Sequence, residues 1–144
     1  MNVDTLNKCL RDELSAVETY RQALDKMRGS YGEDPRFQQL SRMLQDHQQA
    51  ASRVGALIQQ MGGTRTSDSG AWGAWSKTVM GTAKLFGDKA ALKALKEGEE
   101  SGLKDYRDAI DDTSTPADVK TALNTIVSTE QGHVRELDRM MESA

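Results

Sequence analysis

Apolar residues recur every three or four positions along most of the chain, which is the spacing of helices that bury one face. Asp34-Pro35 and Ser114-Thr115-Pro116 each place a capping residue before a proline, as is typical of the first turn of a helix. The spacing and these two starts predict two helical hairpins, over residues 3–61 and 88–142. We therefore expect an all-α fold in which four long helices form an antiparallel bundle.

A long crossover, residues 62–87, connects the two predicted hairpins. Its first part, 62–71, is rich in Gly, Ser and Thr, which predicts an exposed loop. The stretch Trp72–Phe86 is apolar and aromatic, and it predicts a short extra helix that packs over the bundle. The alternative is that Trp72–Phe86 contacts a protein partner or a second copy of the chain, as in a homo-oligomer. A crossover of this length allows the second and third long helices to run parallel.

Length and composition narrow the class of protein. A chain of 144 residues fits a single domain, 1–144. Nineteen Lys and Arg against 22 Asp and Glu give a net charge of −3, so no nucleic-acid partner is expected. No apolar run approaches the ~20 residues of a membrane span. The polar N-terminus and the lone Cys9, which rules out an intrachain disulfide, predict a cytoplasmic protein.

The two hairpins resemble each other, which indicates an internal repeat. A shift of 86 residues superimposes like residues of the two halves: Glu13 on Glu99, Tyr20 on Tyr106, and His47 on His133. His47 and His133 are the only two histidines of the chain, so their coincidence under the same shift as the glutamates carries weight. Such a repeat predicts duplicated units that pack around a pseudo-twofold axis.

Five ionisable side chains interrupt the apolar faces of the predicted helices: Glu13, His47, Glu99, Glu130 and His133. Charged groups are rarely buried unless they are paired or bind a metal. Glu130 and His133 are three residues apart, so they lie on one helix face and can reach a single ion. Carboxylate and imidazole ligands suit iron or manganese, with zinc as a substitute. The alternative is a buried ion-pair network of Glu and His without metal.

These motifs resemble the ferritin-like superfamily, in particular small bacterial ferritin-like proteins whose function is not assigned (a domain of unknown function). The resemblance covers about residues 3–141. It rests on a Glu followed seven residues later by Tyr, in Glu13–Tyr20 and Glu99–Tyr106, and on Glu130-Gln131-Gly132-His133. These are similar to bacterioferritin and rubrerythrin helices. The resemblance implies a carboxylate di-iron site with the five residues as ligands, and tyrosines that support them.

One position departs from the family pattern. The pattern places a carboxylate three residues before each histidine, but the residue three before His47 is Leu44. Five of the six ligands that the resemblance implies are therefore present. Asp46 is the candidate substitute ligand, although one residue is a rotation of about 100° on a helix, so it requires a distorted or rotated helix. The site is then expected to be asymmetric, mononuclear on Glu99, Glu130 and His133, or metal-free.

Two functions follow from these observations. The first is a metal-binding ferritin-like protein that oxidises ferrous iron or reduces peroxide in stress defence, with Tyr20 and Tyr106 orienting the carboxylates. The second is a non-catalytic stress or interaction module with a degenerate metal site. Neither a phosphate-binding glycine loop nor a hydrolase triad is present in the sequence. The sequence assigns no catalytic residue, and it leaves open whether the protein is an enzyme.

Overall fold

Four long helices make up the part of the chain that this computed structural model describes, residues 3–31, 35–67 and 88–142. They are α1 (Val3–Tyr31), α2 (Pro35–Gln60), α4 (Asp88–Asp111) and α5 (Ala117–Glu142). The described residues contain no strand, so the predicted all-α fold class is confirmed. None of the described helices has the combination of length and apolar character that crossing a membrane requires.

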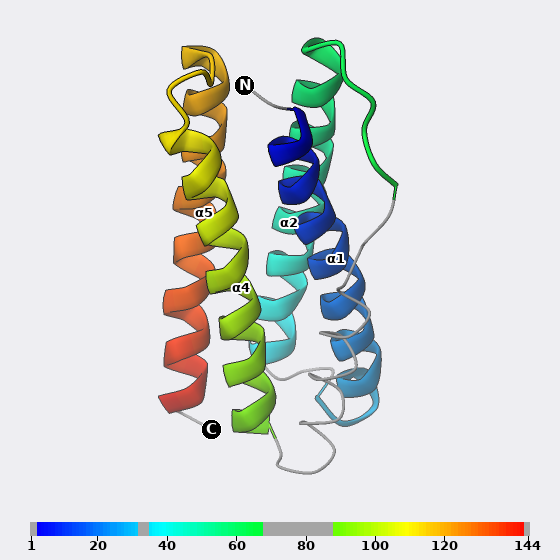
Figure 1. Ribbon diagram of the computed structural model, residues 1–144. Helices are drawn as coiled ribbons and strands as arrows, with labels where there is room; N and C mark the ends of the chain where they lie inside the picture. The colour runs from blue at the N-terminus through cyan, green and yellow to red at the C-terminus, as the bar shows by residue number, and fades with distance from the viewer. Residues whose placement is uncertain (1–2, 32–34, 68–87, 143–144) are drawn as a thin grey trace.

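The helices form an antiparallel bundle of two hairpins (Figure 1). In that view α1 runs down and α2 runs up, and then α4 runs up and α5 runs down. Each helix packs against two others, because α1 contacts α2 and α4, and α5 contacts the same two helices. The diagonal pair α2 and α4 runs parallel, as the long crossover predicts. The extra helix and the partner contact predicted for Trp72–Phe86 fall outside the described residues.

The end of α2 is set by two glycines. Gly62 has a φ of 80°, a left-handed conformation that glycine adopts without steric cost. The N–H of Gly62 donates to the Gln59 carbonyl at 3.0 Å, and that of Gly63 donates to the Ile58 carbonyl at 2.9 Å. This is the Schellman pattern, in which the last carbonyls of the helix find partners. It ends α2 before the crossover begins.

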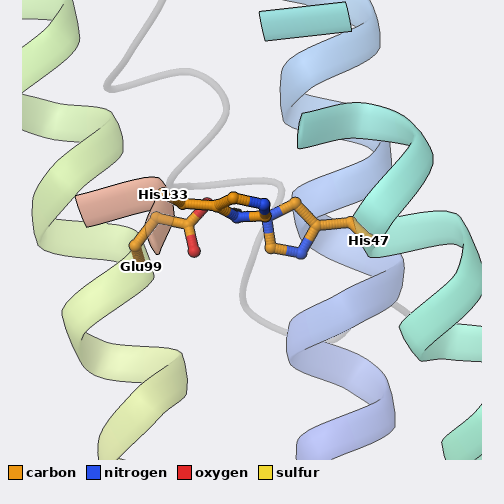
Figure 2. Close-up of side chains that lie close together, drawn as sticks. All are labelled: His47, Glu99 and His133. Atoms are coloured by element: carbon orange, nitrogen blue, oxygen red, sulfur yellow. Dashed lines mark hydrogen bonds and ion pairs between the residues drawn. The ribbon is translucent and has the colours of Figure 1, made fainter. Parts of the chain in front are cut away.

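Halfway along its length, the bundle core contains polar side chains. Figure 2 shows three of them, His47 from α2, Glu99 from α4 and His133 from α5, pointing toward one another in the interior. Glu13 of α1 and Glu130 of α5 belong to the same buried layer. We call these five side chains the polar layer. All four helices contribute to it, so the layer is assembled only when both hairpins pack together.

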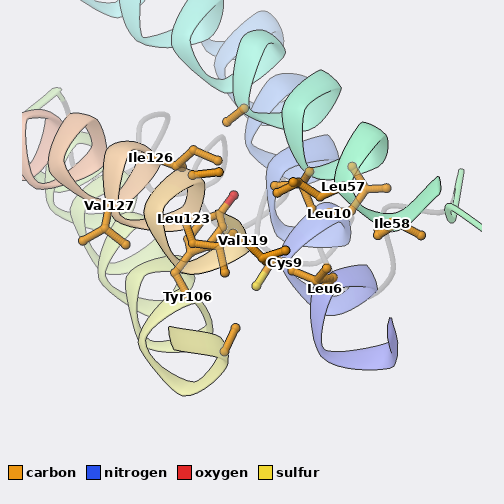
Figure 3. Close-up of a cluster of buried hydrophobic side chains, with 14 of the residues drawn as sticks. Leu6, Cys9, Leu10, Leu57, Ile58, Tyr106, Val119, Leu123, Ile126 and Val127 are labelled. Carbon is orange, nitrogen blue, oxygen red and sulfur yellow. The ribbon is translucent and has the colours of Figure 1, made fainter. Parts of the chain in front are cut away.

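Two apolar clusters enclose the polar layer, one on each side along the bundle. The cluster in Figure 3 includes Leu6, Leu10, Ile58, Tyr106 and Leu123, and it also buries Cys9. The other cluster is formed on the far side of the layer by residues that include Tyr20, Leu40, Leu95 and Leu137. Burial of these side chains holds the helices at the positions that bring the polar layer together.

Candidate metal centre

The structure brings the five predicted site residues together in the centre of the bundle. Their side chains are almost fully buried, with residue exposures of 2–4%: Glu13, His47, Glu99, Glu130 and His133. Burial of this many ionisable groups is costly unless each is compensated by a partner or a bound ion. The contacts within the layer show how much of this compensation the chain supplies itself.

His47 lies at the centre of the layer and contacts all three glutamates. Its Nδ1 is 2.9 Å from Glu13 Oε1, and its Nε2 is 2.7 Å from Glu99 Oε1. Glu130 Oε2 is 3.3 Å from the same Nδ1, within ion-pair distance. Because an imidazolium donates from both nitrogens, a protonated His47 can bridge Glu13 and Glu99 and place one positive charge among the carboxylates.

One oxygen of Glu99 accepts most of the hydrogen bonds in the layer. Glu99 Oε1 lies 2.6 Å from the Tyr20 hydroxyl, which donates to it, 2.7 Å from His47 Nε2 and 3.1 Å from His133 Nδ1. The Tyr20 ring also stacks on the His47 ring, with the centroids 5.2 Å apart. Tyr20 therefore orients both a predicted ligand carboxylate and a predicted ligand imidazole.

Tyr106, the repeat counterpart of Tyr20, is placed less tightly. Burial raises the pKa of Tyr106 well above its usual value, and the negative charge of Glu13 raises it further. The Tyr106 hydroxyl has no hydrogen-bond partner among the residues that the structure describes. For Tyr20, burial and the charge of Glu99 raise the pKa in the same way. The two tyrosines thus hold their protons, but only Tyr20 donates one to a carboxylate.

Asp46 reaches the layer from an unexpected direction. Its Oδ2 is 2.8 Å from His133 Nε2, and its side chain is 38% exposed. The contact needs no distortion of the helix, since α2 is continuous from Pro35 to Gln60. Leu44, by contrast, packs partly buried against the second apolar cluster. Asp46 thus contacts the outer nitrogen of His133, and its role as a substitute for the carboxylate missing at Leu44 stays a prediction.

The pKa values in the layer are shifted by burial and by the charges packed together. Burial lowers the pKa of His47, but Glu99 and Glu13 raise it by more, so it lies well above its usual value. Burial also lowers the pKa of His133, but its hydrogen bond to Glu99 and the charge of Glu99 raise it by more, so the net shift is upward. Burial raises the pKa of Glu99, but His47 and His133 outweigh it, and the net shift is downward. Glu99 is therefore ionised and the histidines tend to keep their protons.

Glu130 has the opposite shift. Burial and then the negative charge of Glu13 raise its pKa well above the usual range, although contact with His47 acts against them. Its neutral form is therefore favoured. The chain holds protons where a cation would otherwise balance the charge, so a metal ion that enters the layer must displace them.

Several carboxylate oxygens in the layer are not satisfied by the chain. Glu13 Oε2, Glu99 Oε2 and Glu130 Oε2 are buried and have no hydrogen-bond partner in the described residues. Glu130 Oε2 lies 3.3 Å from His47 Nδ1, within ion-pair distance, but it makes no hydrogen bond there. A cavity of about 10 Å³ lies beside these carboxylates, which is about the room that one water or one ion needs. Unsatisfied carboxylates, imidazoles and this cavity fit a divalent metal ion.

Two groups of side chains offer ligand atoms within 4.8 Å of one another. One is Glu13, His47 and Glu130, and the other is His47, Glu99 and His133. The sequence suggested a half-site of Glu99, Glu130 and His133 as one alternative. In the structure, Glu130 instead belongs to the group with Glu13 and His47. His47 belongs to both groups through different ring nitrogens. A neutral imidazole has only one lone pair, so it serves one group at a time.

Four further residues line the cavity without having been expected there: Asp12, Ala16, Gly98 and Gly102. Under the 86-residue shift, Asp12 aligns with Gly98, and Gly102 aligns with Ala16. Because these pairs differ in residue type, the repeat that identifies the glutamates gives no signal for them. The one signal was the presence of two glycines one turn apart inside a helix, where glycine is unfavourable.

The fold and the polar layer define a ferritin-like four-helix bundle with a candidate metal centre. A family model described as "Domain of unknown function (DUF2383)" matches residues 1–112, and the chain belongs to this family. No curated protein matches the chain significantly. Bacterioferritin from Rhodobacter capsulatus is similar in structure, with a TM-score of 0.77 over 97% of this chain and 82% of that one. It is 21% identical in sequence, so the likeness concerns the fold; that structure is described as having a metal-free dinuclear site and heme iron.

Proposed function

We propose that this chain is a metal-binding ferritin-like protein that holds iron in the polar layer, with manganese or zinc as substitutes. We further propose that it oxidises ferrous iron and reduces peroxide, as a stress-defence protein would. One observation carries the proposal: the unsatisfied oxygens of Glu13, Glu99 and Glu130 belong to residues that, with His47, line a cavity of ion size. The fold likeness to a bacterioferritin supports it independently.

Each residue has a distinct role in this proposal. Glu13 and Glu130 supply negative charge and oxygen ligands, and His47 supplies a nitrogen once it has lost a proton. Asp46 accepts from His133 Nε2 and so leaves His133 Nδ1 facing the site, an arrangement common for metal-bound histidines. Tyr20 fixes the orientation of Glu99 through its 2.6 Å hydrogen bond. Bound iron would supply the one-electron chemistry that these side chains lack.

The two ligand groups differ in the number of carboxylates they contain, so a single ion should prefer one of them. The group of Glu13, His47 and Glu130 holds two carboxylates, whereas the group of His47, Glu99 and His133 holds one. A divalent cation is stabilised more by the group with more negative charge. If His47 serves the first group, the second keeps only Glu99 and His133 of its three members. We therefore expect the Glu13 group to bind the first ion and the Glu99 group to bind a second ion more weakly.

Metal content after anaerobic loading tests the proposal. The protein would be purified without an affinity tag, loaded with ferrous iron, desalted and analysed by inductively coupled plasma mass spectrometry. Between about one and about two irons per chain are expected for a site of this class. The Glu130→Ala/His133→Ala double variant should lose most of this iron, because it removes one member from each group.

A surface variant controls for nonspecific binding. Glu136→Gln on the same helix changes a carboxylate outside the two ligand groups and should keep the wild-type iron content. Helicity measured by circular dichroism shows whether each variant is folded. Equal iron content in the double variant and in wild type, or no iron, manganese or zinc in wild type, would contradict the proposal. Retained metal without ferrous oxidation on addition of peroxide would leave metal binding but overturn the redox activity.

A further inference from the structure

The two ligand groups of the polar layer differ in the kind of donor atom that they offer. Glu13, His47 and Glu130 offer two carboxylates and one imidazole, and we call them the oxygen-rich group. His47, Glu99 and His133 offer two imidazoles and one carboxylate, and we call them the nitrogen-rich group. Donor type distinguishes divalent ions, since imidazole suits Zn²⁺ whereas carboxylate and water suit Mn²⁺. The two groups are therefore expected to prefer different ions.

The nitrogen-rich group is already gathered around one point. Glu99 Oε1 lies 2.7 Å from His47 Nε2 and 3.1 Å from His133 Nδ1. The two imidazole rings meet edge to face, with their centroids 4.9 Å apart, and Figure 2 shows the three side chains pointing toward one another. Around a tetrahedral Zn²⁺ with bonds of about 2.0 Å, the ligand atoms lie about 3.3 Å apart. The two contacts to Glu99 therefore need to lengthen only slightly to admit the ion.

Both imidazoles of the nitrogen-rich group are oriented by a carboxylate on their other nitrogen. Asp46 Oδ2 lies 2.8 Å from His133 Nε2, and Glu13 Oε1 lies 2.9 Å from His47 Nδ1. In each ring, the second nitrogen is the one that contacts Glu99. A histidine that binds a metal through one nitrogen usually donates from the other to a carboxylate or carbonyl, which fixes the ring. Two histidines and one glutamate, with water as the fourth ligand, form an established donor set for Zn²⁺.

The oxygen-rich group offers a different environment. Glu13 Oε2 and Glu130 Oε2 are buried and have no hydrogen-bond partner in the described part of the chain. Both residues line the cavity of about 10 Å³, which has room for about one water. Mn²⁺ takes oxygen ligands, including water, and nitrogen donors bind it less strongly than they bind Zn²⁺. Donor type and negative charge therefore both favour the oxygen-rich group for Mn²⁺.

His47 belongs to both groups, so two ions in the layer compete for it. Its Nδ1 contacts Glu13 and its Nε2 contacts Glu99, and a neutral imidazole has a lone pair on only one nitrogen. Leu44, three residues before His47, packs against the second apolar cluster and offers no donor atom in its place. Whichever group lacks His47 therefore keeps only two of its three ligands.

We propose that the polar layer separates divalent cations by donor type: Zn²⁺ binds to the nitrogen-rich group, Mn²⁺ binds to the oxygen-rich group, and the two ions compete for His47. This inference rests on the proposed metal binding and adds which ligands each ion takes. For Zn²⁺ the second imidazole outweighs the additional carboxylate, because Zn²⁺ binds nitrogen donors more strongly than Mn²⁺ does. Fe²⁺ lies between the two ions in this respect, and its expected position at the group of Glu13, His47 and Glu130 is unchanged.

X-ray absorption spectroscopy tests the proposal by counting the imidazoles on each ion. Metal-free protein would be loaded with less Zn²⁺ or Mn²⁺ than protein, so that only the preferred position fills. The fine structure at the zinc edge should show two imidazoles per Zn²⁺, and that at the manganese edge should show one per Mn²⁺. Fewer than two imidazoles on Zn²⁺, or two on Mn²⁺, would overturn the proposal while leaving metal binding intact.

Glu99→Gln and Glu130→Gln form a matched pair of variants. Each replaces one buried carboxylate by an amide of the same shape, and the two residues belong to different groups. Glu99→Gln should raise the Kd for Zn²⁺ by at least about tenfold, since even a change behind a ligand costs about 10–100-fold in metal affinity. It should raise the Kd for Mn²⁺ much less, and Glu130→Gln should show the reverse pattern. Glu136→Gln, outside both groups, should leave both affinities unchanged.

Competition with a chromophoric chelator would measure the Kd for Zn²⁺, and the electron paramagnetic resonance signal of free Mn²⁺ would measure that for Mn²⁺. Bound Zn²⁺ should weaken Mn²⁺ binding, because both ions need His47. Equal effects of the two variants on both ions, or Mn²⁺ binding that is independent of Zn²⁺, would overturn the proposal. If Glu99→Gln does not fold, as circular dichroism would show, the zinc-edge spectrum of wild type decides. Wild type that binds iron but not Zn²⁺ would overturn this inference alone, whereas wild type that binds none of the three metals would overturn the proposed function with it.

Discussion

Glu99 shows most clearly how single residues determine the character of the site. One of its oxygens accepts from Tyr20, His47 and His133, while the other has no described partner. The first oxygen fixes the carboxylate in place, and the second stays available to an ion. A buried carboxylate with one satisfied and one unsatisfied oxygen is suited to a metal site, because orientation is provided before the ion binds.

Tyr20→Phe should destabilise the metal-free protein. The change removes a hydroxyl that donates to an ionised buried carboxylate, and such a hydrogen bond contributes about 1.5–3 kcal/mol. Urea denaturation would measure the loss in the free energy of unfolding. Tyr106→Phe is the matched control, since that hydroxyl has no described hydrogen-bond partner, and it should cost clearly less. Equal costs for the two variants would contradict the asymmetry between the tyrosines.

Leu44→Glu should strengthen metal binding and weaken the metal-free fold. The new carboxylate lies three residues before His47, where the repeat has Glu130 before His133. It adds a ligand between the two groups but loses apolar packing against the second cluster, at about 1–2 kcal/mol. Titration with ferrous iron under anaerobic conditions should show more ions bound per chain than in wild type. Leu44→Gln, which has the same shape without the charge, should not show this gain.

At the residue scale, the sequence predicts which side chains meet but not how they are paired. Helical spacing and the 86-residue shift are enough to place all five members of the polar layer in one buried group. Pairing depends on side-chain rotamers and on the angle between helices, which spacing does not encode. The sequence therefore grouped Glu130 with His133, whereas in the structure Glu130 lies with Glu13 and His47, and it did not predict the contact of Asp46 with His133.

At the scale of elements, the helix boundaries follow from local signals near the chain's prolines and glycines. α2 begins at Pro35, and α5 begins at Ala117, directly after Pro116, as the capping pattern predicts. Helices are predictable in this way because their starts and stops depend on nearest neighbours. The cavity beside the polar layer was not predictable, since it depends on which small residues two distant helices, α1 and α4, bring together.

Gly62→Ala tests the local account of where α2 ends. A Cβ at this position meets no atom of the described chain within 4 Å, so the only cost is the left-handed backbone conformation. That cost is about 1 kcal/mol for a residue with a side chain. Thermal denaturation followed by circular dichroism should show a lower Tm. Gly102→Ala, at a helical position with equal space, should raise the Tm instead, and the same change in both variants would contradict this account.

At the scale of the whole molecule, a polar layer separates two apolar clusters, and burying its charged groups costs free energy. Each cluster alone includes residues from all four helices, so the bundle can form on either side of the layer. The layer then holds ionisable groups near one another in a medium of low dielectric constant, where protons or a metal must balance the charge. Stability and metal binding are therefore linked to pH.

The metal-free protein should lose stability as the pH rises above about 6.5. The folded state raises the pKa of His47, His133 and Glu130, so it binds protons that the unfolded chain releases at the ordinary values of 6.5 and 4.5. Stabilisation from the histidines is complete below pH 6.5 and is lost as the pH passes through their raised values. Glu99, whose pKa is lowered, would lose its contribution only in acid.

Urea denaturation from about pH 6 to about pH 9, with a chelator present, would measure this dependence. Glu130→Gln mimics the neutral acid that the fold favours, so its stability should fall less steeply over the same range. A free energy of unfolding that rises with pH in wild type would contradict the proposed charge balance.

Anomalous diffraction at the iron absorption edge tests the central claim most directly. Crystals would be grown anaerobically with ferrous iron, and the anomalous map would locate any bound ion. We predict a strong peak within about 2.0–2.3 Å of ligand atoms from Glu13, His47 and Glu130, with a weaker peak near Glu99 and His133. Peaks confined to surface carboxylates, with none inside the bundle, would contradict the account of the polar layer as a metal site.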